Sequence, residues 1–233
     1  MKYPEDYINK IICGDCLEVM KGIPDKAVNL VITSPPYNIG NNHHTGNIKH
    51  KAYDDNITEW AYQLEQKKVL NELYRVCSDS VFYNHKNRTK DGRMITPYEW
   101  LLSRELEFII KQELVWFNGS QNFDKIRFYP MTERIYWLSK SIDTKFFNHI
   151  NHHDFFEWKP EGTNKIHKRS FPLSLPISIL SCFPKDYLVL DPYIGSGTVA
   201  VACKELGMKY IGIEKNPEYI EIAQRRLSQE YLF

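Results

Sequence analysis

The sequence lacks any long apolar run. No uninterrupted apolar stretch reaches the roughly 18 to 20 residues that a transmembrane helix needs, although 42% of the 233 residues are hydrophobic. The first ten residues are charged and have no apolar core of the kind found in a secretory signal. We therefore expect a protein without a membrane span or an export signal, working in the cytoplasm.

Cysteine is scarce, and its count of five is odd. An intracellular chain keeps such cysteines reduced. The one CxxC pair, Cys13 and Cys16, lacks the second cysteine or histidine pair of a tetrahedral zinc site. We interpret both residues as packing residues, with zinc binding as the minor alternative, and predict no metal site.

The sequence also has no excess of charge, since its formal net charge is only +1. Any nucleic-acid site must then be a local patch. Residues 41–51 contain two lysines and three histidines without an acid, and residues 159–169 contain four basic residues against Glu161 alone. On charge alone, a solvated surface is the favoured interpretation of both stretches.

The pattern of apolar residues predicts one α/β domain that spans residues 1–233. Short apolar runs bounded by turn residues predict strands, and apolar positions at helical spacing predict helices. We expect strands at 27–33, 80–83, 113–117, 134–138, 187–190 and 210–213. We expect helices at 17–22, 58–76, 97–110, 174–182, 199–206 and 217–227. The C-terminal βαβα unit is typical of a Rossmann-like, doubly wound, mostly parallel sheet.

A glycine turn joins the strand and helix of this C-terminal unit. Residues 195–200, GSGTVA, match G-x-G-x-x-[GA], in which glycines allow a sharp turn and close approach to a ligand. The following helix N-terminus presents free N–H groups. Glu214 ends the next strand, where an acid can bind both ribose hydroxyls. The fingerprint alone fits NAD, FAD or S-adenosylmethionine.

Two details favour S-adenosylmethionine among these three cofactors. Asp191 opens the turn, and its carboxylate would repel a pyrophosphate but would attract the amino or sulfonium group of a positively charged cofactor. The unit also comes late in the sequence, where we expect too little chain for the second half of a dinucleotide site.

A second motif follows the first predicted strand. Ser34, Pro35, Pro36 and Tyr37 lie where ligands of open α/β sheets bind, at the C-terminal end of a strand. The prolines remove two N–H donors and keep the chain extended, so that carbonyl oxygens and the Ser34 hydroxyl can accept hydrogen bonds from an NH₂ group. Tyr37 can stack on a planar base. Taken alone, a plain Pro-Pro turn explains this motif equally well.

This geometry suits methyl transfer to an exocyclic amino nitrogen, whose lone pair is delocalised into the base. Acceptors aimed at its two hydrogens favour a pyramidal nitrogen and stabilise the positive charge that develops. Direct transfer from a sulfonium needs no covalent enzyme intermediate. A base in duplex DNA becomes reachable only when it is flipped out.

Together the two motifs resemble the β class of bacterial DNA amino-methyltransferases from restriction–modification systems. In that permuted order the catalytic (D/N/S)PP(Y/F) motif precedes the DPF-x-GSGT cofactor motif, and here TSPPYN occupies 33–38 and DPYIGSGT occupies 191–198. The resemblance covers nearly the whole chain. It implies a class I methyltransferase fold, S-adenosylmethionine as cofactor and double-stranded DNA as partner.

The resemblance also implies roles for particular residues. The catalytic set is Ser34, Pro35, Pro36 and Tyr37. The cofactor-binding set is Asp15, Cys16, His167, Phe171, Asp191, Tyr193, Gly195, Ser196, Gly197, Thr198 and Glu214. Asp15 has a structural alternative, because it can also cap the helix that begins near Leu17. Tyr193 departs from the usual Phe, and Lys168 and Arg169 stand where the family often has Pro and a small residue.

DNA contacts are expected outside the two motifs. We predict a target-recognition insertion at about residues 139–166 and a DNA-facing loop at about 39–56, with basic side chains on phosphates. The predicted DNA-binding residues are Asn38, His43, His44, Lys49, Lys51, Lys165, Lys168 and Arg169. A homodimer and a functional pairing with a restriction endonuclease are further expectations.

The target base and the class of enzyme leave alternatives open. Ser in the first motif position favours N4 of cytosine slightly over N6 of adenine, and the absence of a Pro-Cys dipeptide disfavours cytosine C5 chemistry. Rival hypotheses are a methyltransferase on RNA or protein, an NAD-dependent oxidoreductase, a non-catalytic DNA-binding module, and a nuclease built on His149, His152 and His153.

Overall fold

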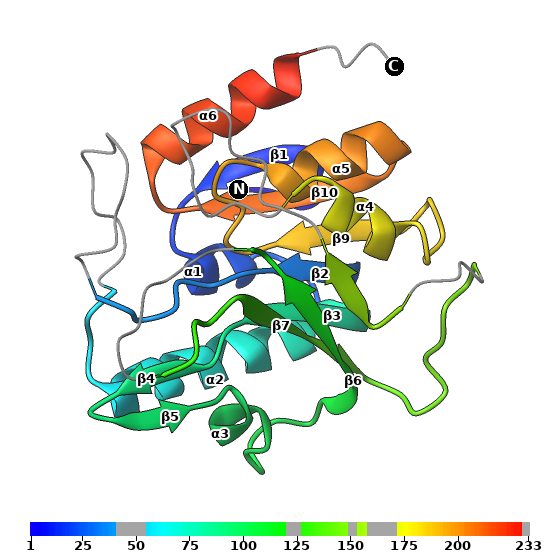
Figure 1. The fold of residues 1–233 in the computed structure, drawn as a ribbon. Coiled ribbons are helices and arrows are strands. Elements are labelled where there is room, and N and C mark those ends of the chain that lie inside the picture. Colours follow the sequence, from blue (N-terminus) through cyan, green and yellow to red (C-terminus); the bar gives the residue numbers. More distant parts are fainter. Residues whose placement is uncertain (41–54, 120–126, 149–152, 158–171, 230–233) are drawn as a thin grey trace.

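An eight-stranded sheet forms the centre of the protein (Figure 1). The computed structural model describes residues 1–40, 55–119, 127–148, 153–157 and 172–229. In spatial order the strands are β1 (Lys10–Cys13), β10 (Lys209–Glu214), β9 (Leu188–Asp191), β2 (Val28–Thr33), β3 (Cys77–His85), β7 (Thr132–Ser139), β6 (Ile109–Phe117) and β8 (Phe155–Glu157). Only β7 runs antiparallel to its neighbours within this sheet. The predicted mostly parallel sheet is thereby confirmed.

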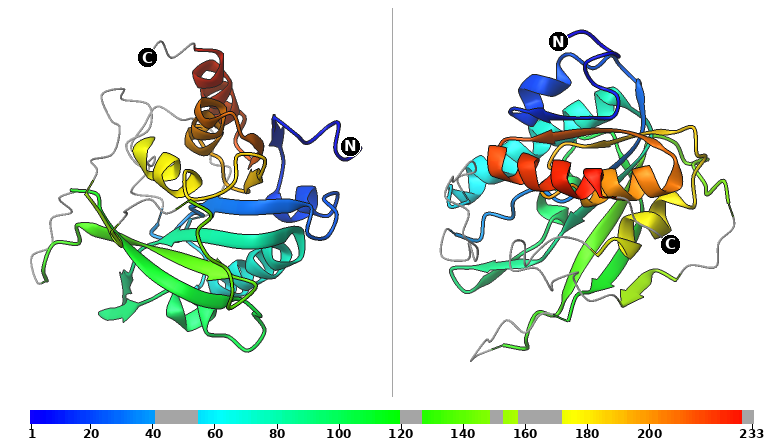
Figure 2. Two further views of the ribbon diagram at one scale, coloured as in Figure 1. Left: turned by 90° about the vertical axis from the view of Figure 1, so that its right-hand side faces the viewer. Right: turned by 90° about the horizontal axis from the view of Figure 1, so that it is seen from above.

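Helices cover both faces of the sheet (Figures 1 and 2). One face carries α1 (Cys16–Met20), α2 (Glu59–Val76) and α3 (Tyr98–Leu101). The other face carries α4 (Ser174–Leu180), α5 (Thr198–Leu206) and α6 (Pro217–Ser228). Helices on both faces of a largely parallel sheet make the doubly wound architecture that the C-terminal unit predicts.

Strand β2 shows why an apolar run becomes a central strand. Its side chains alternate between two hydrophobic clusters: Val31 packs in the cluster under α1 and α2, whereas Leu30 and Ile32 pack in the cluster under α4 and α5. All three are fully buried. A strand covered on both faces must be apolar at successive positions, which is the pattern read from the sequence.

Strands β2 and β9 lie side by side and pair in parallel, Leu30 opposite Val189 and Val31 opposite Leu190. The chain connections on the two sides of this pair run in opposite directions. From β2 the chain passes through α2 to β3 on one side, and from β9 it passes through α5 to β10 on the other. Such a reversal opens a crevice at the carboxyl ends of the two strands, where ligands of open α/β sheets bind. The serine motif follows β2 and the glycine turn follows β9.

The helix predicted at residues 97–110 is wrong in extent. Helix α3 has only four residues, and strand β6 begins at Ile109. Leu106, Phe108 and Ile110 lie at a period of two and pack against the cluster under α2. That spacing belongs to an extended chain, and it overrides the local helical preference.

Several short strands were not predicted. They are β1, β8 and the two-stranded hairpin of β4 (Arg88–Lys90) and β5 (Arg93–Ile95). Each has three or four residues, too few for alternation to be recognised in sequence. Strand β8 lies inside the predicted insertion at residues 139–166, where it pairs in parallel with β6.

The two cysteines of the CxxC pair differ in environment. Cys16 is buried in the core, as predicted, but Cys13 is exposed at the end of the edge strand β1, so its interpretation as a packing residue is wrong. No helix in the described ranges is both long and apolar enough to span a membrane.

Candidate active site

The two sequence motifs meet through one buried hydrogen bond. The Thr33 hydroxyl, at the end of β2, donates to Asp191 Oδ1, at the end of β9, over 3.0 Å. Both side chains are almost completely buried. Because Ser34 follows Thr33 directly, this bond places the start of the serine motif beside the glycine turn at the reversal point of the sheet.

The glycine turn leads from β9 into α5. Gly195 and Gly197 both adopt positive φ angles, of 50° and 86°, which side-chain-bearing residues adopt at a cost. A Cβ on Gly197 would lie 2.7 Å from the Ala223 Cβ of α6. At Gly197 the requirement for glycine therefore comes from packing against α6, in addition to the turn itself.

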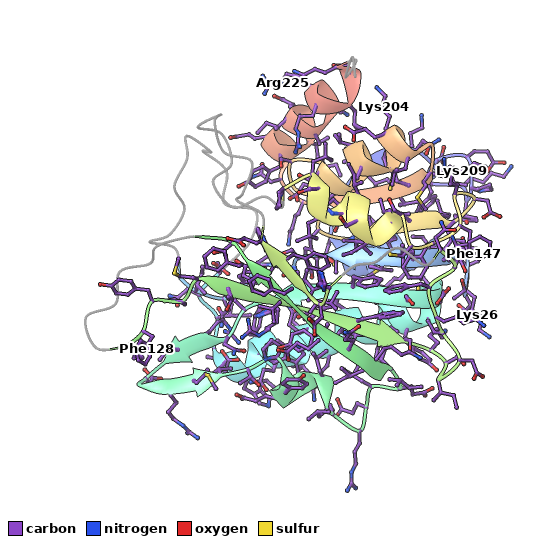
Figure 3. The ribbon with its side chains drawn as sticks, turned by 45° about the vertical axis from the view of Figure 1, so that its right-hand side comes forward. Lys26, Phe128, Phe147, Lys204, Lys209 and Arg225 are labelled. Carbon is purple, nitrogen blue, oxygen red and sulfur yellow. The ribbon has the colours of Figure 1, made fainter. Side chains whose placement is uncertain are left out.

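Arg226 of α6 forms hydrogen bonds to the residues of this turn. Arg226 Nη1 donates to the Ser196 carbonyl at 2.9 Å, to Ser196 Oγ at 3.2 Å and to Thr198 Oγ1 at 2.9 Å. Arg225, its neighbour, points outward from α6 (Figure 3). The sequence analysis missed Arg226, because nothing in the motif marks a partner 28 residues further along the chain.

Glu214 has the position expected of the acid at the end of the second strand. Its Oε2 accepts a hydrogen bond from the Gly195 N–H at 3.0 Å, and its Oε1 accepts one from the Asn216 N–H at 2.7 Å. The residue is only 2% exposed. Two backbone donors thus orient a buried carboxylate beside the turn.

Asp191 is a buried acid with a perturbed pKa. Burial raises its pKa to about 7, nearby Glu214 adds to the rise, and the bonds from the Tyr193 N–H and Thr33 oppose it. Both bonds use Oδ1. A buried carboxyl group that is half-protonated near neutral pH would be stabilised in its charged form by a cationic ligand.

The structure confirms the capping alternative for Asp15. Its Oδ1 accepts a hydrogen bond from the Leu17 N–H at 3.0 Å at the start of α1, and its Oδ2 lies 3.6 Å from Lys215 Nζ. Neighbouring Cys16 contacts Tyr193, and burial raises the pKa of its thiol to about 11. Two other predicted cofactor residues, His167 and Phe171, lie outside the described residues.

The serine motif is bound into a polar network at the ends of β3 and β7. Ser34 Oγ and Tyr37 Oη are 2.7 Å apart, and the Tyr37 hydroxyl donates to Glu133 Oε2 at 2.8 Å. Asn84 Nδ2 contacts Ser34 Oγ at 3.2 Å, Glu133 Oε2 at 2.8 Å and the Tyr37 hydroxyl. Asn118 Nδ2 donates to Glu133 Oε1 at 3.2 Å.

The sequence analysis did not assign Asn84 or Glu133 to the site, although a signal for Asn84 existed. It stands near the C-terminal end of the strand parallel to β2, where ligand-binding side chains of such sheets gather. Glu133 comes from the antiparallel strand β7, whose partner in the sheet could not be read from sequence. The pairing of Asn84 with Ile135 brings Glu133 to the same edge.

Tyr37 and Pro36 rest on a buried aromatic pair. The Tyr37 ring lies 4.6 Å from the His85 ring, and the Tyr62 hydroxyl lies 2.8 Å from the Pro36 carbonyl and 2.7 Å from His85 Nε2. Burial lowers the pKa of His85 to about 3, so the ring is neutral at pH 7. Its Nδ1 faces the Lys86 carbonyl, which only accepts, so Nδ1 carries the hydrogen, and Nε2 and the Pro36 carbonyl share the one hydrogen of the Tyr62 hydroxyl.

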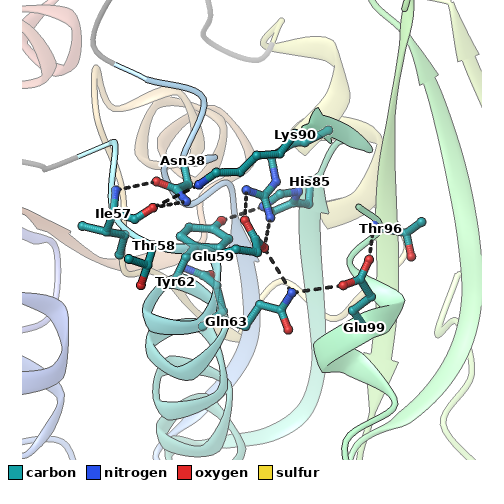
Figure 4. Close-up of polar contacts among 12 residues, drawn as sticks. Asn38, Ile57, Thr58, Glu59, Tyr62, Gln63, His85, Lys90, Thr96 and Glu99 are labelled. Atoms are coloured by element: carbon teal, nitrogen blue, oxygen red, sulfur yellow. Dashed lines mark hydrogen bonds and ion pairs between the residues drawn. The ribbon is translucent and has the colours of Figure 1, made fainter. Parts of the chain in front are cut away.

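Asn38 uses its side chain inside the protein. Its Nδ2 donates to the Ile57 carbonyl at 3.0 Å, and its Oδ1 accepts from the Ile57 N–H at 2.9 Å (Figure 4). Arg88 forms a two-point ion pair with Glu59 and thereby fixes the β4–β5 hairpin to α2. Contact between the Asn38 amide and DNA would therefore require breaking two hydrogen bonds.

The other predicted DNA-binding residues lie outside the described residues, as do His149 and His152 of the nuclease hypothesis. Those DNA-binding residues are His43, His44, Lys49, Lys51, Lys165, Lys168 and Arg169. Across the described ranges, no group of three or more His, Cys, Asp or Glu side chains could bind a metal ion.

Fold and site together define a Rossmann-like α/β enzyme of the class I methyltransferase type. The chain belongs to the DNA methylase family of N6 and N4 methyltransferases, whose model matches residues 28–225. Membership confirms the predicted activity, S-adenosylmethionine-dependent methylation of DNA at an amino group, and disfavours the oxidoreductase, RNA, protein and nuclease alternatives.

Named relatives and solved structures agree with this family. The chain is 29% identical to the type II methyltransferase M.HinfI of Haemophilus influenzae, covering 96% of this chain and 69% of the relative. It is 27% identical to M.BglII of Bacillus subtilis, covering 98% and 71%. Among solved structures, the cytosine-N4-specific PvuII DNA methyltransferase matches with a TM-score of 0.79 at 19% identity, covering 98% of this chain and 91% of that one. The M1.HpyAVI–SAM complex matches with a TM-score of 0.69 at 20% identity, covering 94% and 99%.

Proposed function

We propose that this protein methylates the exocyclic amino group of a base flipped out of duplex DNA, with N4 of cytosine as the first candidate and N6 of adenine as the second. The observation that carries the proposal is the Thr33–Asp191 hydrogen bond, which joins the start of the serine motif to the cofactor turn. Ser34 in the first motif position supports cytosine. The proposed cellular location is the cytoplasm.

The cofactor is assigned to the crevice at the ends of β9 and β10. In this assignment Glu214 binds the two ribose hydroxyls with a carboxylate that Gly195 and Asn216 already orient. Asp191 faces the positively charged methionine end, and Asp15 the adenine. The remaining proposed contacts come from Cys16, His167, Phe171, Tyr193, Gly195, Ser196, Gly197 and Thr198. When bound, the cofactor supplies a methyl group attached to a sulfonium. After the transfer the sulfur departs as a neutral thioether, which is a good leaving group.

The serine motif is assigned to the base. Ser34 Oγ and the Pro35 carbonyl accept the two hydrogens of the amino group and stabilise the charge that develops on nitrogen. Within the described part of the chain the Pro35 carbonyl has no hydrogen-bond partner, whereas the Pro36 carbonyl lies 2.8 Å from the Tyr62 hydroxyl and shares its one hydrogen with His85 Nε2. One face of Tyr37 rests against His85, and the base stacks on the other.

Further proposals concern assembly and partners. The predicted insertion at residues 139–166 and loop at residues 39–56 remain our candidates for DNA contact, with basic residues on phosphates. A homodimer would supply more DNA-binding surface than so short an insertion offers. Pairing with a restriction endonuclease is the proposed biological setting.

Replacing Ser34 by alanine tests the assignment of the motif. Ser34→Ala removes one acceptor from the reacting amino group, and we expect the single-turnover methylation rate to fall about 10²-fold. Affinity for S-adenosylhomocysteine should stay unchanged, because Ser34 lies on the base side of the site. Ser228→Ala, at the exposed end of α6, is the matched control and should keep the wild-type rate. A fully active Ser34→Ala enzyme would show that the motif does not contact the reacting group.

A further inference from the structure

We infer that Glu133 is the final acceptor of the proton released during methyl transfer, and that Ser34 and Tyr37 carry the proton to it. The inference rests on the proposed function, since it takes the amino group of the base to lie against Ser34. Glu133 was not assigned a role by the motif, and it acts here through two hydroxyl groups of that motif.

Methylation of an amino group releases one proton per turnover. The nitrogen lone pair forms the new N–C bond, and the S–C bond breaks with its electron pair going to sulfur. The nitrogen then carries two hydrogens, one methyl group and a positive charge, so it must lose one hydrogen as H⁺ to give the neutral product. Ser34, Tyr37 and Glu133 are partly buried, and an acceptor within the protein can take this proton directly from the hydrogen-bonded motif.

The structure contains a continuous hydrogen-bonded path from the motif to a carboxylate. Ser34 Oγ lies 2.7 Å from Tyr37 Oη, and Tyr37 Oη lies 2.8 Å from Glu133 Oε2. An ionised carboxylate can only accept, so the one Tyr37 hydrogen points to Glu133. The Ser34 hydrogen must then point to Tyr37. Because each of the two hydroxyl groups has one hydrogen and the carboxylate has none, protons can move along the path in one direction, away from the base and toward Glu133.

Asn84 supports the same polarity. Its Nδ2 lies 2.8 Å from Glu133 Oε2 and 3.2 Å from Ser34 Oγ. Turning the amide over would bring two acceptor oxygens together at Glu133, so the contact with Glu133 fixes the amide orientation. Asn84 Oδ1 is then buried without a partner among the described residues, which is a cost that the contact with Glu133 offsets. Asn118 adds another donor to the carboxylate at 3.2 Å.

The transfer can therefore proceed without a free charged intermediate. As the N–C bond forms, the amino hydrogen passes to Ser34 Oγ, the Ser34 hydrogen passes to Tyr37 Oη, and the Tyr37 hydrogen passes to Glu133 Oε2. Each hydroxyl gives one proton and receives one, and Glu133 ends protonated. Burial raises the pKa of Tyr37 well above its ordinary value, which keeps the phenol protonated and ready to donate at neutral pH.

Two variants interrupt the path at different atoms. Tyr37→Phe removes the connecting hydroxyl but keeps the ring, and Glu133→Gln removes the acceptor but keeps its shape. We expect either change to lower the single-turnover rate with saturating cofactor about 10²-fold. The control is Glu113→Gln, because Glu113 also accepts a tyrosine hydroxyl hydrogen, from Tyr98 at 2.7 Å, but within the described residues it has no hydrogen bond to Ser34 or Tyr37.

The solvent deuterium isotope effect on the same step separates proton transfer from a structural role. Wild type and Glu113→Gln should react more slowly in D₂O than in H₂O, whereas Tyr37→Phe and Glu133→Gln should lose that difference. Thermal melting and S-adenosylhomocysteine binding report whether each variant is folded. Folded variants with wild-type rates, or with lowered rates and an unchanged isotope effect, would overturn the path while leaving the proposed methylation intact. Failure of the wild type to methylate DNA would instead contradict the proposed function.

Discussion

Asp191 shows how much of a residue's chemistry depends on its surroundings. The sequence predicts a carboxyl group at the start of the glycine turn, and the structure places it there. Its pKa of about 7 comes from burial, which no local pattern reveals. At neutral pH this acid is divided between its two protonation states, a property expected at functional sites.

The raised pKa of Asp191 gives a prediction about stability. Because the folded protein binds this proton more tightly than the unfolded chain, Asp191 contributes less stability as pH rises from about 4 to about 7. Buried His85, with its pKa lowered to about 3, contributes in the opposite direction over much of that range. The wild-type pH dependence alone therefore does not isolate Asp191.

The difference between wild type and Asp191→Asn isolates it. Asparagine can still accept the hydrogen bonds from Thr33 and Tyr193, and it does not titrate. We expect the stability of the variant relative to wild type to increase from pH 4 to pH 7 and then to level off, measured by chemical denaturation at each pH. A difference that stays constant with pH would show that Asp191 has an ordinary pKa.

Some of the individual site residues could be predicted from the sequence and others could not. Ser34, Tyr37 and Glu214 lie in motifs or at strand ends, so their positions follow from local sequence. Glu133 meets Tyr37 across 96 positions of the chain, and only the pairing of β3 with β7 brings it there. Sequence reasoning lacked that pairing, so it could name the hydroxyl groups but not the carboxylate they contact.

At the scale of elements, α6 does more than cover the sheet. Gly197 must be glycine partly because Ala223 of α6 occupies the space of a side chain. Arg226 of the same helix donates to Ser196 and Thr198. The last helix thus fixes the shape of the cofactor turn, and its amphipathic pattern, read from sequence, did not show this.

Arg226 can be tested against its neighbour. Arg226→Gln loses charged hydrogen bonds that keep the turn in shape, and we expect affinity for S-adenosylmethionine to fall about tenfold. Arg225→Gln removes the same charge from an exposed position, where the side chain bonds, among the described residues, only to the Glu221 carbonyl of its own helix, so affinity should be kept. Calorimetric titration of both variants is the measurement. Equal affinities would mean that the turn does not depend on α6.

The long elements were predictable and the short ones were not. The bounds of α2, α5 and α6 agree with the predicted helices to within a residue or two, because each presents a sustained apolar face. The prediction of one helix over residues 97–110 is wrong because Leu106, Phe108 and Ile110 follow a strand period of two, and α3 has only four residues. Short edge strands carry too few residues for any period to emerge.

At the scale of the whole molecule, the two motifs lie far apart in sequence and adjacent in space. The sheet reverses its connections between β2 and β9, and both motifs stand at that reversal. In the function that we propose, this arrangement puts the methyl donor beside the glycine turn and the hydrogen-bond acceptors for the amino group in the serine motif next to it. The permuted order of motifs changes nothing in this geometry, since only the spatial order of the strands matters.

The most direct measurement of the central claim is methyl transfer itself. Purified protein would be incubated with radiolabelled S-adenosylmethionine and unmethylated duplex DNA, and the DNA would be digested to nucleosides and separated. We predict label in N4-methylcytidine. Label in the N6-methyladenine nucleoside would keep the enzyme class and correct the base. An absence of label in DNA, from a protein that binds the cofactor, would contradict the account.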